Sequence, residues 1–210
     1  MSAGYLIAFE GIDGSGKSTA VRAVAARLRS EGYTVDVTRE PGGTPLGTQI
    51  RELIMASAET IAPDAELLLM CADRAEHLAK LIEPALTEGH IVITDRYAAS
   101  TIAYQGYGHG IDLARVQAAL DLATNGRWPD LTLLLDIPVA TADQRRRRNL
   151  AAMDALDRRA GEFRERVRTG YLVQANGNPD WVTIDATTAP GQVADACYAA
   201  IRDRLLAGVT

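Results

Sequence analysis

The sequence has few cysteines and no long apolar run. Its 210 residues include only Cys71 and Cys197, which lie far apart and show no paired spacing. We therefore expect neither a disulfide nor a zinc site, and we interpret both as reduced core residues. No apolar run reaches the ~20 residues of a membrane helix, and no basic region precedes the first apolar stretch, so a signal peptide is not expected. The sequence predicts a cytoplasmic protein without membrane contact.

Positive charge is also scarce, because 22 Lys and Arg face 27 Asp and Glu, a net charge of −5. This balance argues against non-specific binding to nucleic acid. A chain of this charge that acts on a phosphorylated substrate must gather its cations at one place. Its length and its ordinary apolar content suit one α/β domain, which we expect to span residues 1–210.

Short β-rich runs alternate with longer helical patterns. Five strands are predicted, at Tyr5–Phe9, Thr34–Thr38, Ile91–Thr94, Leu131–Leu135 and Trp181–Ile184. Helices are predicted at Ser18–Glu31, Leu46–Ala56, Asp64–Glu88 (kinked or ended by Pro84), Asp112–Ala123, from Val139, at Glu162–Ala175 and at Pro190–Leu206. Nearly all-apolar strands in this alternation favour a doubly wound, five-stranded parallel sheet flanked by helices. Ligands of such sheets bind at the carboxyl ends of the strands.

The most specific motif follows the first predicted strand and fits G-x-x-x-x-G-K-[ST], the P-loop pattern. Its nine residues are Gly11, Ile12, Asp13, Gly14, Ser15, Gly16, Lys17, Ser18 and Thr19. Glycines let the backbone N–H groups turn toward a phosphate, and the helix that follows adds its positive end. Lys17 would reach the β- and γ-phosphates of ATP and Ser18 would ligate Mg²⁺, so the chain is expected to have a P-loop NTPase-type fold.

A P-loop predicts nucleotide binding but leaves the reaction open among a small-substrate kinase, a switch or motor, and an NTP-binding protein without kinase activity. A kinase needs a second anion site nearby. Arg39 and Glu40 follow the second strand, where they could grip a phosphate and accept from a hydroxyl. Asp95 and Arg96 follow the third strand, where they could support Mg²⁺ and face the moving phosphoryl group. Ordinary ion pairs at strand ends are the alternative for both.

Two further segments suggest a pocket for a base. Met70 and Arg74 are four residues apart on a predicted helix and so share one face. Tyr104 and Gln105 lie in a stretch that also holds the hydroxyls of Ser100 and Thr101. An apolar side chain beside a cation could hold a pyrimidine and its carbonyl. A core methionine with a surface arginine pair is the alternative.

Taken together, these segments resemble bacterial thymidylate kinases over nearly the whole chain. The most specific runs are T-R-E-P-G-G-T (38–44), A-D-R-A (72–75), D-R-Y (95–97), A-Y-Q-G (103–106), P-D-L-T-L-L-L-D (129–136) and E-R-V-R-x-G-Y-L (165–172). The resemblance implies Mg²⁺-dependent transfer of the γ-phosphate of ATP to dTMP, for dTTP synthesis, by a homodimer. It also implies a short basic lid, here within about residues 140–160.

The resemblance implies roles at the matching positions. Asp13 would lie near the acceptor or its metal, Arg39, Arg51 and Arg96 would hold the acceptor phosphate, and Tyr104 would pack on the sugar and disfavour a 2′-hydroxyl. Arg74 would bond the thymine O4, and Ser100, Thr101 and Gln105 would surround the base. Expected catalytic residues are Lys17, Arg96, Asp13 and, because Gly14 stands where some members carry an arginine, a lid arginine such as Arg158.

The sequence departs from the family pattern at three positions. Met70 replaces a phenylalanine, so another 5-substituted deoxyuridine monophosphate is an alternative acceptor. His109 replaces an arginine, which makes a fixed cation titratable. An ungapped alignment sets Ala155 against the lid arginine of the family, with Arg158 one turn away. The four arginines 145–148 are the most basic run, and at most two of them can face a phosphate.

Overall fold

The fold is built on one five-stranded parallel sheet. The computed structural model describes residues 4–56, 61–147 and 156–207, without the side chains of 56, 146–147 and 156–160. The strands are β1 (Tyr5–Glu10), β2 (Val35–Arg39), β3 (Ile91–Asp95), β4 (Leu131–Asp136) and β5 (Trp181–Asp185), in the order β2-β3-β1-β4-β5. All four neighbouring pairs are parallel. The predicted sheet is confirmed, and each predicted strand end lies within one residue of the observed end.

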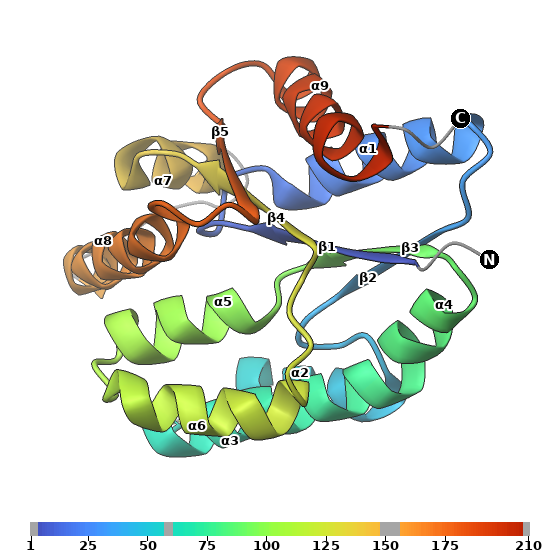
Figure 1. Cartoon of the computed structure of the whole chain (residues 1–210). Helices are drawn as coiled ribbons and strands as arrows, with labels where there is room; N and C mark the ends of the chain where they lie inside the picture. Colours follow the sequence, from blue (N-terminus) through green and yellow to red (C-terminus); the bar gives the residue numbers. More distant parts are fainter. Residues whose placement is uncertain (1–3, 57–60, 148–155, 208–210) are drawn as a thin grey trace.

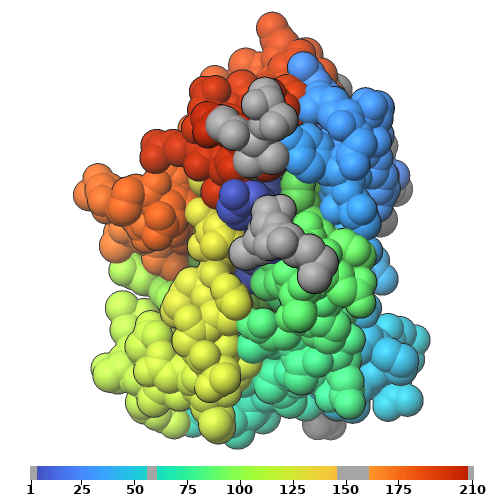
Figure 2. Space-filling view, turned by 45° about the vertical axis from the view of Figure 1, so that its right-hand side comes forward, coloured from blue at the N-terminus to red at the C-terminus, as the bar shows by residue number. Residues whose placement is uncertain are grey.

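Helices cover both faces of the sheet (Figure 1). They are α1 (Lys17–Ser30), α2 (Pro45–Ala56), α3 (Pro63–His77), α4 (Glu83–Thr87), α5 (Ala98–Thr101), α6 (Leu113–Thr124), α7 (Val139–Arg147), α8 (Leu156–Ala175) and α9 (Pro190–Ile201). Three π-helical segments continue α3, α5 and α9, namely η1 (Leu78–Ile82), η2 (Ile102–Gly108) and η3 (Arg202–Leu206). α1 and α9 lie together on one face, and α3 to α6 lie on the other. Figure 2 shows the blue and red segments of α1 and α9 together at the top, above the green helices.

Alternation along the central strand sends side chains into two cores. Ile7 and Phe9 of β1 join the buried cluster beneath α1 and α9, whereas Leu6 and Ala8 join the cluster against α3 and α6. Successive side chains of a strand point to opposite faces. A strand covered on both faces therefore has a nearly continuous apolar sequence, which is why β1 was easy to predict.

The helix predicted at Asp64–Glu88 is three consecutive helical segments. The five-residue π-helical η1 lies directly before α4, and Pro84 is among the first residues of α4. Proline lacks an N–H and clashes with the preceding turn, and a widened turn relieves both problems without ending the helix. Pro84 thus changes the helical pairing locally while the chain stays helical.

The helical stretch α5–η2, residues 98–108, was not predicted. Its β-branched, aromatic and glycine residues have low intrinsic helix propensity. Burial of Ala99 and Ala103 in the core cluster, at 5% and 0% exposure, favours the helix through tertiary packing. The start of α8 at Leu156, six residues before the predicted start, is a second difference.

Within the described segments, no helix combines the length and the apolar character that crossing a membrane requires.

Candidate active site

The loop between β1 and α1 forms a cradle closed by a lysine. Gly16 caps α1 with a φ of 99°, a conformation that glycine adopts without strain. The Lys17 Nζ donates to the backbone oxygens of Gly11 and Ile12 at 2.8 and 3.2 Å. Burial, and then the charge of Arg96, lower the pKa of Lys17 to about 8. A desolvated cation at the positive end of a helix is a strong site for an anion.

Two oxygen side chains meet beside this cradle. The Ser18 hydroxyl at the start of α1 donates to Asp95 Oδ2 at the end of β3, at 2.7 Å. Mg²⁺ prefers oxygen ligands, and in nucleotide enzymes it uses one or two protein groups together with phosphate oxygens. The pair predicted to hold the metal is therefore already assembled and chemically suited to it. In the described part of the chain, no cluster of three or more His, Cys, Asp or Glu side chains is arranged for a metal.

A cavity of about 690 Å³ lies over the cradle. It is lined by residues 13–20, by Arg39, Glu40, Arg51, Asp95 and Arg96, and also by Arg145, Thr188, Pro190 and Val193. Of the predicted loop residues, Gly11 and Ile12 do not line it. Their backbone oxygens accept hydrogen bonds from Lys17 instead. Arg145 from the basic run reaches this cavity and donates to the Thr187 oxygen at 3.3 Å. Arg148 lies outside the described residues, as do the side chains of Arg146, Arg147, Arg158 and Arg159.

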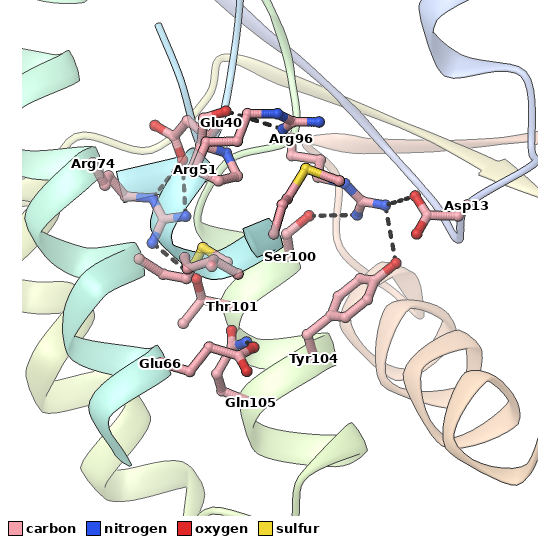
Figure 3. Close-up of a pocket in the computed structure, with 14 residues that line it drawn as sticks. Asp13, Glu40, Arg51, Glu66, Arg74, Arg96, Ser100, Thr101, Tyr104 and Gln105 are labelled. Atoms are coloured by element: carbon pink, nitrogen blue, oxygen red, sulfur yellow. Dashed lines mark hydrogen bonds and ion pairs between the residues drawn. The ribbon is translucent and has the colours of Figure 1, made fainter. Parts of the chain in front are cut away.

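A second cavity, of about 220 Å³, adjoins the first (Figure 3). Its lining includes the six residues predicted to hold the base and the sugar, Met70, Arg74, Ser100, Thr101, Tyr104 and Gln105, together with Pro41, Ile54, Met55 and Glu66. Asp13, Glu40, Arg51 and Arg96 border both cavities. These four residues form the seam between two compartments that open onto each other.

Arg96 at the seam has a strained backbone. Its φ of 78° lies in the left-handed region that non-glycine residues rarely adopt. The Arg96 N–H donates to the Phe9 oxygen at 3.0 Å, and the Thr94 hydroxyl donates to the Arg96 oxygen at 2.7 Å. Such strain costs about 1–3 kcal/mol and persists where surrounding contacts impose it, often at functional sites.

The guanidinium of Arg96 is fixed by four side chains, one from the β1–α1 loop and one each from α5, η2 and α8. Nη2 donates to Asp13 Oδ1 at 2.8 Å and to the Tyr104 hydroxyl at 2.9 Å. Nη1 donates to Ser100 Oγ at 3.0 Å and to the Tyr171 hydroxyl at 2.9 Å. Figure 3 shows Asp13, Ser100 and Tyr104 around this group. Arg96 is thus pre-oriented between the two cavities.

Glu10, which sequence analysis missed, anchors this network from below. The fully buried Glu10 accepts from the Tyr97 N–H at 2.8 Å, from Ser100 Oγ at 2.6 Å and from the Tyr171 hydroxyl at 3.0 Å. Burial raises the pKa of Glu10, although the nearby charge of Arg96 opposes that shift. An acidic residue at the end of an apolar strand, directly before the glycine loop, was the available signal.

A second buried network holds Arg74. Its Nε donates to Glu40 Oε2 at 2.9 Å, its Nη1 to the Thr101 hydroxyl at 3.0 Å, and its Nη2 to the Tyr97 oxygen at 3.1 Å. His77 Nδ1 lies 2.9 Å from Glu40 Oε1. Arg74 and Glu40 are 2% and 4% exposed, so the alternative of a surface arginine pair is wrong. Glu40 uses both oxygens to hold these partners, and its proposed contact with a substrate hydroxyl stays a prediction.

Arg51 at the seam and Arg39 on the wall of the larger cavity add further positive charge. Arg51 Nη1 donates to the Pro41 oxygen at 3.2 Å. Within residues 4–56, 61–147 and 156–207, no carboxylate forms an ion pair with either arginine. This acidic chain therefore gathers positive charge around the seam, where it can attract an anion.

Comparison with known proteins agrees with this arrangement. A family model described as thymidylate kinase matches residues 9–197. A thymidylate kinase of Thermomicrobium roseum is 46% identical over 205 residues, which are 97% of each chain. One from Cereibacter sphaeroides is 48% identical over 93% of this chain and 94% of its own, and one from Nitratidesulfovibrio vulgaris is 46% identical over 89% and 87%.

Proposed function

This chain belongs to the thymidylate kinase family, and we propose that it transfers the γ-phosphate of ATP to dTMP, giving dTDP, with the two substrates in the joined cavities. The single observation that carries the proposal is the seam, where Asp13, Glu40, Arg51 and Arg96 border both compartments. A protein that only binds or hydrolyses NTP has no use for a second lined cavity beside its phosphate cradle.

Lys17 and the cradle bind the β- and γ-phosphates of ATP. The lysine turns from the two backbone oxygens it now contacts toward the phosphates, whose charge favours its protonated form. Ser18 and Asp95 hold Mg²⁺, which when bound neutralises charge on the β- and γ-phosphates. Thr188 and Pro190, which also line this cavity, border the space for the adenosine.

Arg96, Arg39 and Arg51 bind the acceptor phosphate and align its oxygen with the γ-phosphorus. No general base is required, because the attacking phosphate is already anionic. The planar guanidinium of Arg96 also suits the charge that spreads over the transferred group. Positioning and electrostatic stabilisation therefore account for the catalysis, with Asp13 setting the direction of Arg96.

The smaller cavity takes the nucleoside. Arg74 donates to the thymine O4, Met70 covers the ring, and Gln105 and Thr101 border its polar edge. Tyr104 packs against the sugar and disfavours a 2′-hydroxyl. Ser100 contributes indirectly, because its hydroxyl is engaged with Arg96, Glu10 and Tyr171.

The basic stretch after Val139 acts as a lid that supplies a further cation. Arg145 already borders the ATP cavity, and we assign the catalytic lid role to Arg158. Single alanine variants at 145, 147, 148, 158 and 159 should show one large loss of kcat. If all five keep the wild-type kcat, the lid assignment is wrong.

Two exposed leucines on neighbouring helices suit contact with a second copy of the chain. Leu68 on α3 and Leu122 on α6 are 64% and 86% exposed, and these two helices pack against each other. We propose that this surface joins two copies in a cytoplasmic enzyme. Light scattering of the wild type and of a Leu68→Glu, Leu122→Glu variant tests it, and a monomeric wild type would refute it.

A coupled ADP-release assay tests the function directly. With ATP and Mg²⁺, ADP release should require a deoxynucleoside monophosphate, and among dTMP, dUMP, dCMP, dGMP and dAMP it should be fastest with dTMP. ADP release that is independent of every acceptor would refute the proposal and favour an NTPase.

A further inference from the structure

Glu66 has no assigned role, yet it lies on the wall of the smaller cavity. It projects from α3 one turn before Met70, and its Oε1 accepts from Gln105 Nε2 at 2.7 Å. Its other oxygen, Oε2, lies 3.6 Å from His109 Nε2 at the end of η2. Figure 3 shows the side chains of Glu66 and Gln105 meeting at the end of the cavity away from Arg96.

The contact fixes which end of the Gln105 amide faces the cavity. An ionised carboxylate only accepts hydrogen bonds, so the group 2.7 Å from Glu66 is the NH₂ and cannot be the carbonyl. The contact with the His109 imidazole is the main cause that lowers the pKa of Glu66, which favours the ionised carboxylate. Turning the amide would set its oxygen against a carboxylate oxygen.

The Gln105 carbonyl oxygen is then left for a ligand. Gln105 is 2% exposed, and in the described part of the chain no side chain or backbone N–H is recorded as donating to its Oε1. An acceptor atom that faces a cavity gains a hydrogen bond when a ligand brings a donor to it. The cavity therefore presents an acceptor here, whereas the guanidinium of Arg74 brings positive charge to another part of its wall.

We propose that Glu66 is a positioning residue that sets base specificity by locking Gln105 as an acceptor. The inference rests on the proposed function. Thymine and uracil carry a donor at N3 between two carbonyls, whereas cytosine carries an acceptor at N3. A fixed carbonyl oxygen at Gln105 accepts from the N3–H of thymine or uracil and repels the N3 lone pair of cytosine. The contact between Glu66 and Gln105 therefore favours thymine and uracil over cytosine.

His109 and its surroundings hold Glu66 from the other side. The His109 ring packs on Phe163 of α8 with centroids 4.9 Å apart. Arg166 of α8 donates twice to the Gly108 oxygen, at 3.1 and 2.8 Å, which fixes the backbone next to His109. Since both oxygens of Glu66 are directed by neighbours, its carboxylate has one favoured orientation toward Gln105.

Glu66→Gln tests the proposal, because its amide can meet Gln105 with either end and the lock is lost. Steady-state kinetics with dTMP, dUMP and dCMP should show KM for dTMP and for dUMP rising about tenfold together, the loss of about one hydrogen bond. The kcat and the KM for ATP should stay within about twofold. The ratio of kcat/KM for dTMP over dCMP should fall about tenfold or more, and the ratio for dTMP over dUMP should not change.

Glu76→Gln is the matched control, because it makes the same change on α3 away from both cavities. In a Gln105→Leu background, Glu66→Gln should have no further effect on the dTMP to dCMP ratio. If Glu66→Gln folds poorly, the same ratio is measured in Glu66→Asp. Its side chain is one methylene shorter, so the carboxylate is drawn back from Gln105 and the ratio should fall there as well.

An unchanged dTMP to dCMP ratio in Glu66→Gln, or an equal further fall in the Gln105→Leu background, would overturn the inference while leaving the kinase function intact. A wild type that does not phosphorylate dTMP would refute the proposed function itself. The same set of kinetic measurements therefore distinguishes failure of the Glu66 proposal from failure of the proposed function.

Discussion

The donor and acceptor cavities share a seam but are built differently. The donor cradle is one continuous segment, 11–19, which runs from the loop after β1 into α1 and whose binding groups are mainly backbone N–H groups and one lysine. The acceptor cavity is built from side chains of α2, α3, α5 and η2, held by buried charges such as Glu40, Arg74 and Glu10. Backbone geometry recognises what every nucleotide shares, whereas a side-chain network can be specific for one base.

The two cavities also differ in how their buried cations affect the stability of the fold. Lys17 is a buried cation whose pKa is lowered, so its charge opposes folding. Arg74 is a buried cation with a carboxylate partner at 2.8 Å and further acceptors around it. We therefore expect a substitution of Arg74 to lower mainly the stability of the fold, and a substitution of Lys17 to lower mainly the rate of the reaction.

The largest effect is expected at the seam. Arg96→Met should lower kcat about 10³-fold, because a preoriented cation that stabilises a transferred phosphoryl group is worth that much. Arg96→Lys should recover little, since Lys lacks the fork that contacts four partners. Steady-state assays with both substrates varied measure this. Arg204→Met, on the distant η3, is the control, and an equal loss there would point to a general charge effect.

The next largest effect is expected on the stability of the fold, where Arg74 and Lys17 should differ. Arg74→Met leaves Glu40 buried without its cation and should cost about 3 kcal/mol of unfolding free energy, and it should raise KM for dTMP but not for ATP. Lys17→Met should lower kcat strongly while leaving the unfolding free energy unchanged or higher. Urea unfolding of both variants measures this, and equal destabilisation would contradict the contrast.

A pH effect on stability is expected from Asp73 beneath the acceptor side. Asp73 is 1% exposed, its Oδ1 accepts from the Gly42 N–H at 3.1 Å, and its Oδ2 has no recorded partner in the described part of the chain. Burial, and then the charge of Glu40, raise the pKa of Asp73 from 3.8 to about 6. The folded state therefore binds more protons between these values, so this group's stabilisation is full below pH 3.8 and is lost as pH rises through about 6.

Asp73→Asn should remove this pH dependence, because Asn stays neutral and can still accept from Gly42. Relative to wild type, the variant should gain about 2 kcal/mol of unfolding free energy between pH 4 and 7. Urea titrations at four pH values measure the difference. Asp64→Asn, an exposed carboxylate on the same helix, is the control, and a constant difference between Asp73→Asn and wild type would show that Asp73 does not titrate in this range.

The smallest effect concerns Met70 on the cavity wall. A flexible thioether tolerates varied shapes, so the wild type should use bulkier 5-substituted deoxyuridine monophosphates within about tenfold of dTMP. Met70→Phe should narrow this range several-fold. Comparison of kcat/KM across the series measures it. A preference for dTMP of about 100-fold or more, unchanged in Met70→Phe, would contradict this prediction and remove that alternative acceptor.

The strand ends of β1 to β5 and the cradle 11–19 could be predicted, because apolar runs and glycine spacing encode them locally. The helix α5–η2 could not, because packing of Ala99 and Ala103 overrides weak helix propensity there. The contact between Glu10 and Tyr171 could not be predicted either, because these residues are 161 positions apart and meet only through the fold.

The sequence by itself determined the sheet, the phosphate cradle and the residue types of a second anion site, because these depend on periodicity and short motifs. Only the tertiary structure decided that Glu40 holds Arg74, that Arg96 takes a left-handed backbone between Asp13 and Tyr104, and that Glu66 directs Gln105. Each of these joins side chains from different elements in a buried space. Distance and desolvation there set the hydrogen-bonding role and charge of each group, and neither is encoded in local spacing.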